Sequence, residues 1–145
     1  MIRHVVLSLL LLGALLTPAT VLGQDAELRR TVQGIAAAWQ RSDADRVASY
    51  GGRDGIDLEL TSLRMNRLAP RRAAAVLRRL FADSEMVDVR TTSIQRTGGR
   101  PSRAFAELTW VLRAPGTTQS VRSRVFLALV RESGTWRLDQ IRLLR

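Results

Sequence analysis

The sequence predicts an α+β domain in which a curved, mostly antiparallel sheet packs on about three helices from the first half of the chain. Two segments before residue 83 repeat apolar side chains at helical spacing. Four later segments, 86–96, 103–113, 121–132 and 135–144, are strand-like. Short gaps with turn residues join them, so consecutive strands should be antiparallel neighbours. No internal repeat or linker interrupts the sequence, which favours one domain.

The first expected helix carries Leu28, Val32, Ile35 and Trp39 at intervals of four, three and four, which places them on one stripe. The segment 42–45, Ser-Asp-Ala-Asp, has the form of a capping box that starts at the serine. It predicts the end of this helix and the start of a short second one, which a glycine-rich break follows.

The segment 56–61 alternates apolar and polar residues, which is typical of a strand with one buried face, and we expect 63–68 to form a short neighbour. Pro70 suits the first position of a helix. Residues 71–82 then sort into two faces. The apolar face carries Ala73, Val76, Leu77, Leu80 and Phe81, and the opposite face carries Arg71, Arg72, Arg78 and Arg79.

Two of the later strands are partly apolar on both faces. In 103–113 and 121–132, the alternate positions include Phe105, Val111, Phe126, Ala128 and Val130. Two or three helices can cover only one face of a sheet. We therefore expect a homodimer that forms through the outer sheet face, the alternative being a steeply curved sheet whose edges bury part of that face.

The first 23 residues have the layout of a secretory signal peptide. Arg3 and His4 precede an apolar run over 5–16, and short side chains precede Gln24, so we expect cleavage after Gly23 and export to the periplasm or beyond. An uncleaved anchor is disfavoured, because this run is shorter than the roughly 20 residues that span a bilayer. A lipoprotein is disfavoured because no cysteine exists to carry lipid. Residues 24–145 are then a single domain with no transmembrane segment.

Composition restricts the chemistry of this domain. All 23 basic residues are arginines; residues 24–63 hold 5 of them with 7 acids, and residues 64–145 hold 17 with 6 acids. The lack of cysteine excludes disulfide scaffolds, thiol enzymes and Cys-ligated metals. The single histidine, His4, lies in the leader, so the mature domain lacks His, Cys and Lys. This favours a protein without enzymatic activity, metal or cofactor.

The order of elements resembles the nuclear transport factor 2-like fold, also called cystatin-like, an α+β cone in which a bent sheet wraps around helices. The likeness lies in the segments 56–60, 76–81 and 136–143 and spans nearly all of 25–145. Within that superfamily the chain resembles small exported bacterial proteins of unknown function. The resemblance implies either a small-molecule isomerase, dehydratase or hydrolase, or a non-catalytic binding or transport module. Because its motifs are core-packing patterns, it implies fold rather than activity.

For an enzyme of ketosteroid isomerase type, the weak candidates are three acids and one tyrosine. Asp57, Glu59 and Glu107 lie in otherwise apolar strands, where burial could raise the pKa of a carboxyl group into a useful range. Tyr50 could donate a hydrogen bond to a developing oxyanion. The alternation of the strands explains the three acids equally well as members of a solvent-facing set.

For a binding pocket, the candidates are the bulky side chains that can line a cone-shaped cavity, namely Trp39, Tyr50, Trp110 and Trp136. The alternative is that they pack in the core.

A third possibility is binding of a polyanion through Arg71, Arg72, Arg78, Arg79, Arg122 and Arg124. Guanidinium groups suit phosphates and carboxylates, so an anionic lipid, envelope polymer or acidic protein could be a partner. Arg100 and Arg103 could join this cluster at the strand ends. Nucleic acid is disfavoured because the chain has no recognised reader motif and few aromatic residues. The alternative is an ordinary solvated face.

The sequence therefore favours an exported, non-catalytic module of the cell envelope that binds a small ligand or another protein. The alternatives are a cofactor-free isomerase or hydrolase that uses carboxylates and tyrosine inside the cone, and an arginine-rich binder of polyanions or anionic lipids. The first two separate on one observation, which is whether a carboxylate points into a cavity enclosed by the cone.

Overall fold

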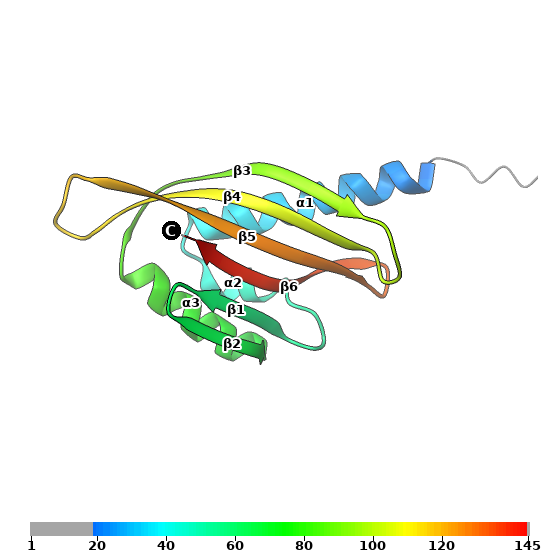
Figure 1. Ribbon diagram of the computed structural model, residues 1–145, viewed down its shortest axis with the longest axis horizontal. Coiled ribbons are helices and arrows are strands. Elements are labelled where there is room, and N and C mark those ends of the chain that lie inside the picture. The colour runs from blue at the N-terminus through cyan, green and yellow to red at the C-terminus, as the bar shows by residue number, and fades with distance from the viewer. Residues whose placement is uncertain (1–18, 145) are drawn as a thin grey trace, which may run out of the picture.

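The computed structural model describes residues 19–144 (Figure 1). The helices of this part are α1 (Ala19–Gln40), α2 (Ala44–Ala48) and α3 (Pro70–Ala82). The strands are β1 (Ile56–Leu60), β2 (Leu63–Leu68), β3 (Glu85–Thr97), β4 (Arg103–Arg113), β5 (Ser120–Glu132) and β6 (Thr135–Leu144). These elements confirm the predicted α+β class and the predicted order of helices and strands.

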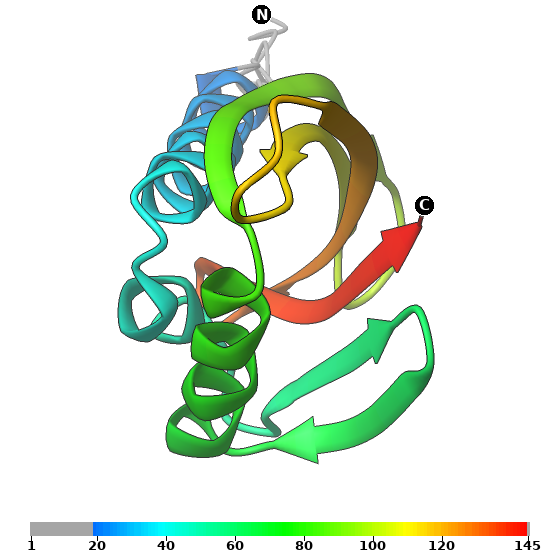
Figure 2. The same cartoon turned by 90° about the vertical axis from the view of Figure 1, so that its left-hand side faces the viewer.

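The six strands form one sheet in the order β2-β1-β6-β5-β4-β3. From β3 to β6 each strand is antiparallel to the next, so the predicted meander is confirmed. The first and last strands, β1 and β6, pair in parallel, which makes the sheet mixed. Figure 2 shows the sheet curling around the axis of the molecule, with the open end of the resulting cone toward the viewer and α1 and α3 beside it.

The helices form where the sequence pattern places them. Leu28, Val32, Ile35 and Trp39 are all buried, as the stripe on α1 predicts. The cap of α2 is Asp43 and not Ser42, because the Asp43 carboxylate accepts the backbone N–H of Arg46 at 3.0 Å. Ser42 instead takes a left-handed backbone conformation (φ 55°), which reverses the chain between α1 and α2.

A compact apolar core fills the interior between the helices and the inner sheet face. The rings of Trp39, Phe81 and Trp110 meet edge to face, with centroid distances of 5.1, 5.6 and 6.3 Å. On β4 the buried side chains are Ala104, Ala106, Leu108 and Trp110, which alternate with residues of the outer face. Aromatic and aliphatic side chains thus occupy the middle of the cone.

The expected signal peptide falls mostly on residues 1–18, outside the described part of the chain. Within residues 19–144 no helix combines the length and the apolar character that crossing a membrane requires.

Candidate functional site

An apolar cleft of about 250 Å³ lies at the open end of the cone, where the end of α3, the β4–β5 hairpin and the end of β6 meet. Figure 2 looks toward this end. The lining side chains are mostly aliphatic, with one indole, two hydroxyls and one carboxylate: Leu80, Asp83, Ser84, Trp110, Leu112, Ala114, Val121, Ser123 and Leu143. We call this the cone-mouth cleft. Apolar walls with a few polar groups are typical of small-ligand sites.

A second cleft, also about 250 Å³, adjoins it between α3 and the β1–β2 turn. The two share Leu80, Asp83 and Leu143 as lining residues. The second also includes Val76 and Arg79. Val76 and Leu80 belong to the predicted apolar face of α3 but are only half-buried, because they face these clefts instead of the closed core.

Ser123 is the exception among the buried side chains of residues 19–144, since the others are apolar. It lies opposite Trp110 in the β4–β5 register, and both residues are 2% exposed. The Trp110 indole N–H contacts the sulfur of Met86 at 3.2 Å. The Ser123 hydroxyl makes no hydrogen bond with the described side chains of residues 22–144, and it lines the cone-mouth cleft.

Of the four aromatic pocket candidates, the structure places Trp110 in the cleft wall. Trp39 and Trp136 are buried in the core, and the Trp136 indole N–H donates to the Gln24 carbonyl at 3.3 Å. Tyr50 is half-buried, with the Arg46 guanidinium 5.2 Å from its ring centroid, and it lines neither cleft.

The three candidate acids lie on the outer face of the sheet. Asp57 accepts the backbone N–H of Arg67 at 2.7 Å. Glu59 lies between Arg64 at 2.8 Å and Arg142 at 3.0 Å. The hydrogen bond from Arg64, assisted by the charges of both arginines, lowers the pKa of Glu59 despite the opposing effect of desolvation.

Glu107 alternates with the buried Ala106 and Leu108 and therefore also points outward. None of the three acids points into the interior of the cone, which holds Trp39, Phe81 and Trp110. The predicted carboxylate-plus-tyrosine site is thus not brought together by this fold.

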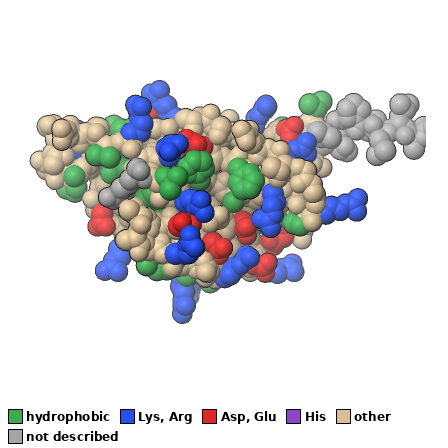
Figure 3. All heavy atoms as spheres, viewed as in Figure 1, with side chains coloured by type: hydrophobic (Ala, Val, Ile, Leu, Met, Phe, Trp, Pro, Cys, Tyr) green, Lys and Arg blue, Asp and Glu red, His purple; other side chains and the backbone are tan. Residues whose placement is uncertain are grey.

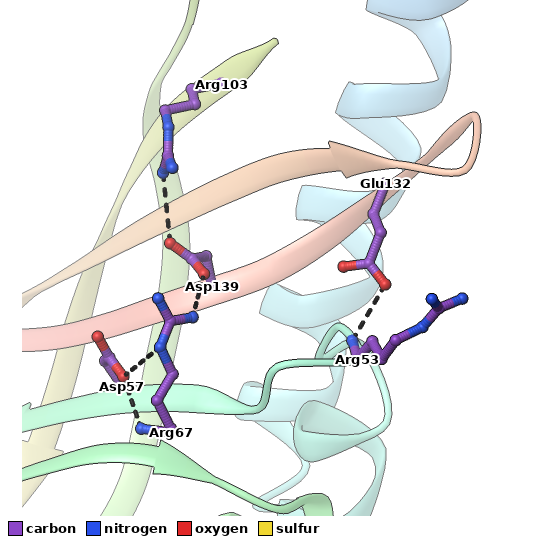
Figure 4. A network of polar contacts seen from close by, with 6 residues as sticks. All are labelled: Arg53, Asp57, Arg67, Arg103, Glu132 and Asp139. Carbon is purple, nitrogen blue, oxygen red and sulfur yellow. Dashed lines mark hydrogen bonds and ion pairs between the residues drawn. The ribbon is translucent and has the colours of Figure 1, made fainter. Parts of the chain in front are cut away.

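A larger cavity of about 370 Å³ lies at the other end of the outer face. Several of its charged side chains take part in contacts that Figure 4 shows. Arg67 and Arg103 each lie 3.4 Å from the Asp139 carboxylate, and Glu132 accepts the backbone N–H of Arg53 at 3.1 Å. The two ion pairs of Asp139 join β2, β4 and β6, and a charged ligand that approached Arg67, Arg103 or Asp139 would have to displace these partners.

The predicted basic residues divide between two surfaces. Arg71, Arg72, Arg78 and Arg79 are exposed on α3, where Arg78 pairs with Asp45 at 2.9 Å. Arg122 and Arg124 lie on the outer face of β5, and the Arg124 guanidinium is 5.8 Å from the Phe126 ring centroid. Arg103 pairs with Val130 at the opposite end of the same hairpin, so it does not join Arg122.

The outer face carries an apolar patch on β4 and β5. Phe105 lies opposite Ala128, with Phe126 and Val130 as the next residues on that face of β5. Phe105 is 47% exposed and the other three are half-buried. Figure 3 looks onto this face and shows hydrophobic side chains among arginines and acids.

Sequence reasoning missed Asp83, Leu143 and Ser123 as lining residues. The signal for Ser123 was present, because it begins the buried alternation of β5 as a polar residue among Val125, Leu127 and Leu129. Nothing in the local pattern marks Asp83, which becomes part of the cleft because α3 ends beside the end of β6. No group of three or more metal-ligating side chains comes together within residues 19–144.

Similar structures identify the fold. A DUF4783 family protein from Bacteroides ovatus superimposes with a TM-score of 0.61 at 17% identity, covering 76% of this chain and 90% of its own. An NTF2-like protein with a cystatin-like fold from Novosphingobium aromaticivorans gives 0.61 at 16%, covering 86% and 83%. A hypothetical protein with a ketosteroid isomerase-like fold from Catenulispora acidiphila, in complex with trimethylamine, gives 0.62 at 16%, covering 79% and 84%.

No protein-family model matches this chain, and no curated protein matches it by sequence. The chain has the nuclear transport factor 2-like, or cystatin-like, fold, as the sequence resemblance implied. Its structural relatives include DUF4783 proteins, which are of unknown function. At these sequence identities the structural similarity establishes the fold and does not indicate an activity.

Proposed function

We propose that this chain is a non-catalytic module of the cell envelope that binds a small, mostly apolar ligand in the cone-mouth cleft. The observation that carries the proposal is the Ser123 hydroxyl opposite Trp110 in a mostly aliphatic cleft, where it makes no hydrogen bond with the described side chains of residues 22–144. A hydroxyl at a core position has no packing advantage over an aliphatic side chain, whereas it can orient a bound molecule. The complex of the Catenulispora protein with trimethylamine supports small-ligand binding on this fold.

The placement of the three acids that the sequence suggested as catalytic groups argues against catalysis by these three residues. Asp57 and Glu59 are occupied by arginine partners on the outer sheet face, and Glu107 points to that face as well. A general acid or base has to reach the reacting atoms of a bound molecule. A ligand in the cleft would lie on the inner side of the sheet, so these three carboxylates could not reach it.

Export after cleavage at Gly23 is the second part of the proposal. Directly after this position, the Gln24 side chain accepts a hydrogen bond from Arg96 at 3.2 Å and Asp25 pairs with Arg96 at 3.1 Å. Leu22 is 70% exposed, and nothing lies within 4 Å of the Cβ position of Gly23. Removal of the residues before Gln24 would therefore leave these contacts intact. Amino-terminal sequencing of the exported protein tests the cleavage site.

Binding is tested by titrating hexan-1-ol into the protein while tryptophan fluorescence is recorded, because Trp110 lines the cleft. We expect a saturable change that the Ser123→Val substitution, which enlarges the side chain in the cleft floor, abolishes. The matched control is Thr109→Val on the outer face of β4. Circular dichroism verifies that both variants are folded. An equal response in both variants, or no saturable response in the unmodified protein, would overturn the proposal.

A further inference from the structure

We propose that the ligand of the cone-mouth cleft is a protonated organic amine. Its ammonium group contacts the Asp83 carboxylate, and its alkyl portion lies against the apolar wall of the cleft. The inference rests on the proposed function and specifies the chemical class of the ligand.

Asp83 is the one charged side chain among the residues that line the cone-mouth cleft in the described part of the chain. The protein has 23 arginines and a formal net charge of +10, but none of the arginines among residues 22–144 lines that cleft. The remaining lining groups are aliphatic, aromatic or hydroxyl-bearing. Among the described lining residues the charge is therefore negative, opposite to that of the whole molecule.

The Asp83 carboxylate has no basic partner within 4.0 Å among residues 19–144. By contrast, the acids nearest to it in the sequence, Glu85 and Asp88, are paired with Arg113 at 3.2 Å and Arg90 at 2.6 Å. Arg79 lies one helical turn before Asp83 and lines the adjoining cleft, but it does not come within ion-pair distance. An incoming cation can thus meet a carboxylate without displacing a guanidinium.

The end of α3 adds to this preference. The helix ends at Ala82, and Asp83 is its C-cap residue with φ −80° and ψ −4°. The carboxyl end of a helix carries a partial negative charge from its unpaired carbonyl groups. Asp83 and the helix end therefore act in the same direction, and both favour an ammonium group over a carboxylate.

The other lining groups suit the rest of such a ligand. The Ser84 and Ser123 hydroxyl oxygens can accept hydrogen bonds from an ammonium group, and leucines 80, 112 and 143 provide an apolar wall for an alkyl chain. The net positive charge of the protein repels cations at long range, but salt at physiological strength screens exposed charges beyond about 8 Å. The contact with Asp83 is within that distance and is screened less.

The test compares three six-carbon probes at pH 7: hexylammonium, hexan-1-ol and hexanoate. Each is titrated into the full chain while tryptophan fluorescence is recorded. Since a hydrogen bond to a charged partner is stronger than a neutral one by about 1.4 kcal/mol, we expect hexylammonium to bind about tenfold more tightly than hexan-1-ol. We expect hexanoate to bind most weakly.

Asp83→Asn is expected to remove the tenfold preference for hexylammonium over hexan-1-ol. The matched control is Asp54→Asn, which removes an exposed carboxylate that makes no ion pair within residues 19–144 and lies outside both clefts. Equal binding of hexylammonium and hexan-1-ol, or tighter binding of hexanoate, would overturn the amine inference and leave the proposed function standing. Failure of all three probes to bind would overturn the proposed function itself.

Discussion

Trp110 on β4 and Ser123 on β5 face each other across the inner side of the sheet, and each is 2% exposed. Positions of this kind are filled by aliphatic residues further along β5, at Val125, Leu127 and Leu129. The hydroxyl therefore replaces apolar contact at a place where the inner face meets the cone-mouth cleft. This relationship is the basis of the first prediction.

Ser123→Val should stabilise the ligand-free protein. The substitution adds apolar volume beside Trp110 and removes a hydroxyl that has no hydrogen-bond partner within residues 19–144. We expect the free energy of unfolding in urea to rise by about 1 kcal/mol, the value of roughly one buried methylene group. A loss of stability would show that the hydroxyl is structural, which contradicts its assignment to ligand binding.

Two Trp→Phe substitutions should lower the free energy of unfolding by different amounts. The Trp39 indole nitrogen is buried without a partner within the described residues, whereas the Trp136 indole donates to the Gln24 carbonyl. Both lose similar apolar contact, but only Trp136→Phe also loses a hydrogen bond. We expect Trp136→Phe to lower the free energy of unfolding by about 1 kcal/mol more than Trp39→Phe does, as measured by urea denaturation. Equal costs would contradict this account of the two rings.

The ion pairs of Glu59 should contribute to stability at neutral pH and be lost in acid. Arg64, by its hydrogen bond, and then Arg142 hold the pKa of Glu59 below its ordinary value in the folded protein. A lowered folded pKa means that the contribution is present above the unfolded pKa and disappears as the pH falls through the folded one. Glu59→Gln should therefore reduce the difference in urea midpoint between pH 7 and pH 3.

The control for this experiment is Glu107→Gln. Glu107 lies on the same outer face and makes no ion pair within residues 19–144. Glu107→Gln should leave the difference in urea midpoint between pH 7 and pH 3 close to that of the unmodified protein. An equal reduction of this difference by both variants would contradict a specific role of Glu59.

The outer apolar patch of Phe105, Phe126, Ala128 and Val130 should join two copies of the chain. A two-fold interface requires a self-complementary surface, and this patch is bordered by both signs of charge, with Glu107 and Arg124 as examples. We expect a dimer in sedimentation equilibrium at concentrations of tens of micromolar and a monomer for Phe105→Asp. A monomeric unmodified protein under these conditions would count against this interface.

Local patterns were sufficient to predict most of the fold. The alternation at 103–113 predicts β4 with its bounds, and the two faces of 71–82 predict α3, because burial of one face requires that periodicity. The parallel pairing of β1 with β6 was not predicted, since it joins strands far apart in the sequence and leaves no local signal. The cap of α2 was misplaced by one residue, because Ser42 and Asp43 are both suitable capping residues.

The site was less predictable than the fold. Trp110 was a pocket candidate, and the structure places it in the cleft wall. Asp83, Ser123 and Leu143 come from three different elements and meet only through the curvature of the sheet, which single-sequence periodicity does not describe. Asp57 and Glu59 were candidate acids because they lie in an otherwise apolar strand. Their carboxylates instead lie on the outer face, where they contact arginine residues.

The central claim, that the cone-mouth cleft binds a small ligand, is tested most directly by nuclear magnetic resonance. Hexylammonium is titrated into the isotope-labelled protein, and the amide and indole N–H signals are followed. We predict saturable shifts confined to Leu80, Asp83, Trp110, Ser123, Leu143 and their neighbours. Shifts that centre on the outer face around Phe105 and Phe126, or no saturable shifts at all, would contradict the claim.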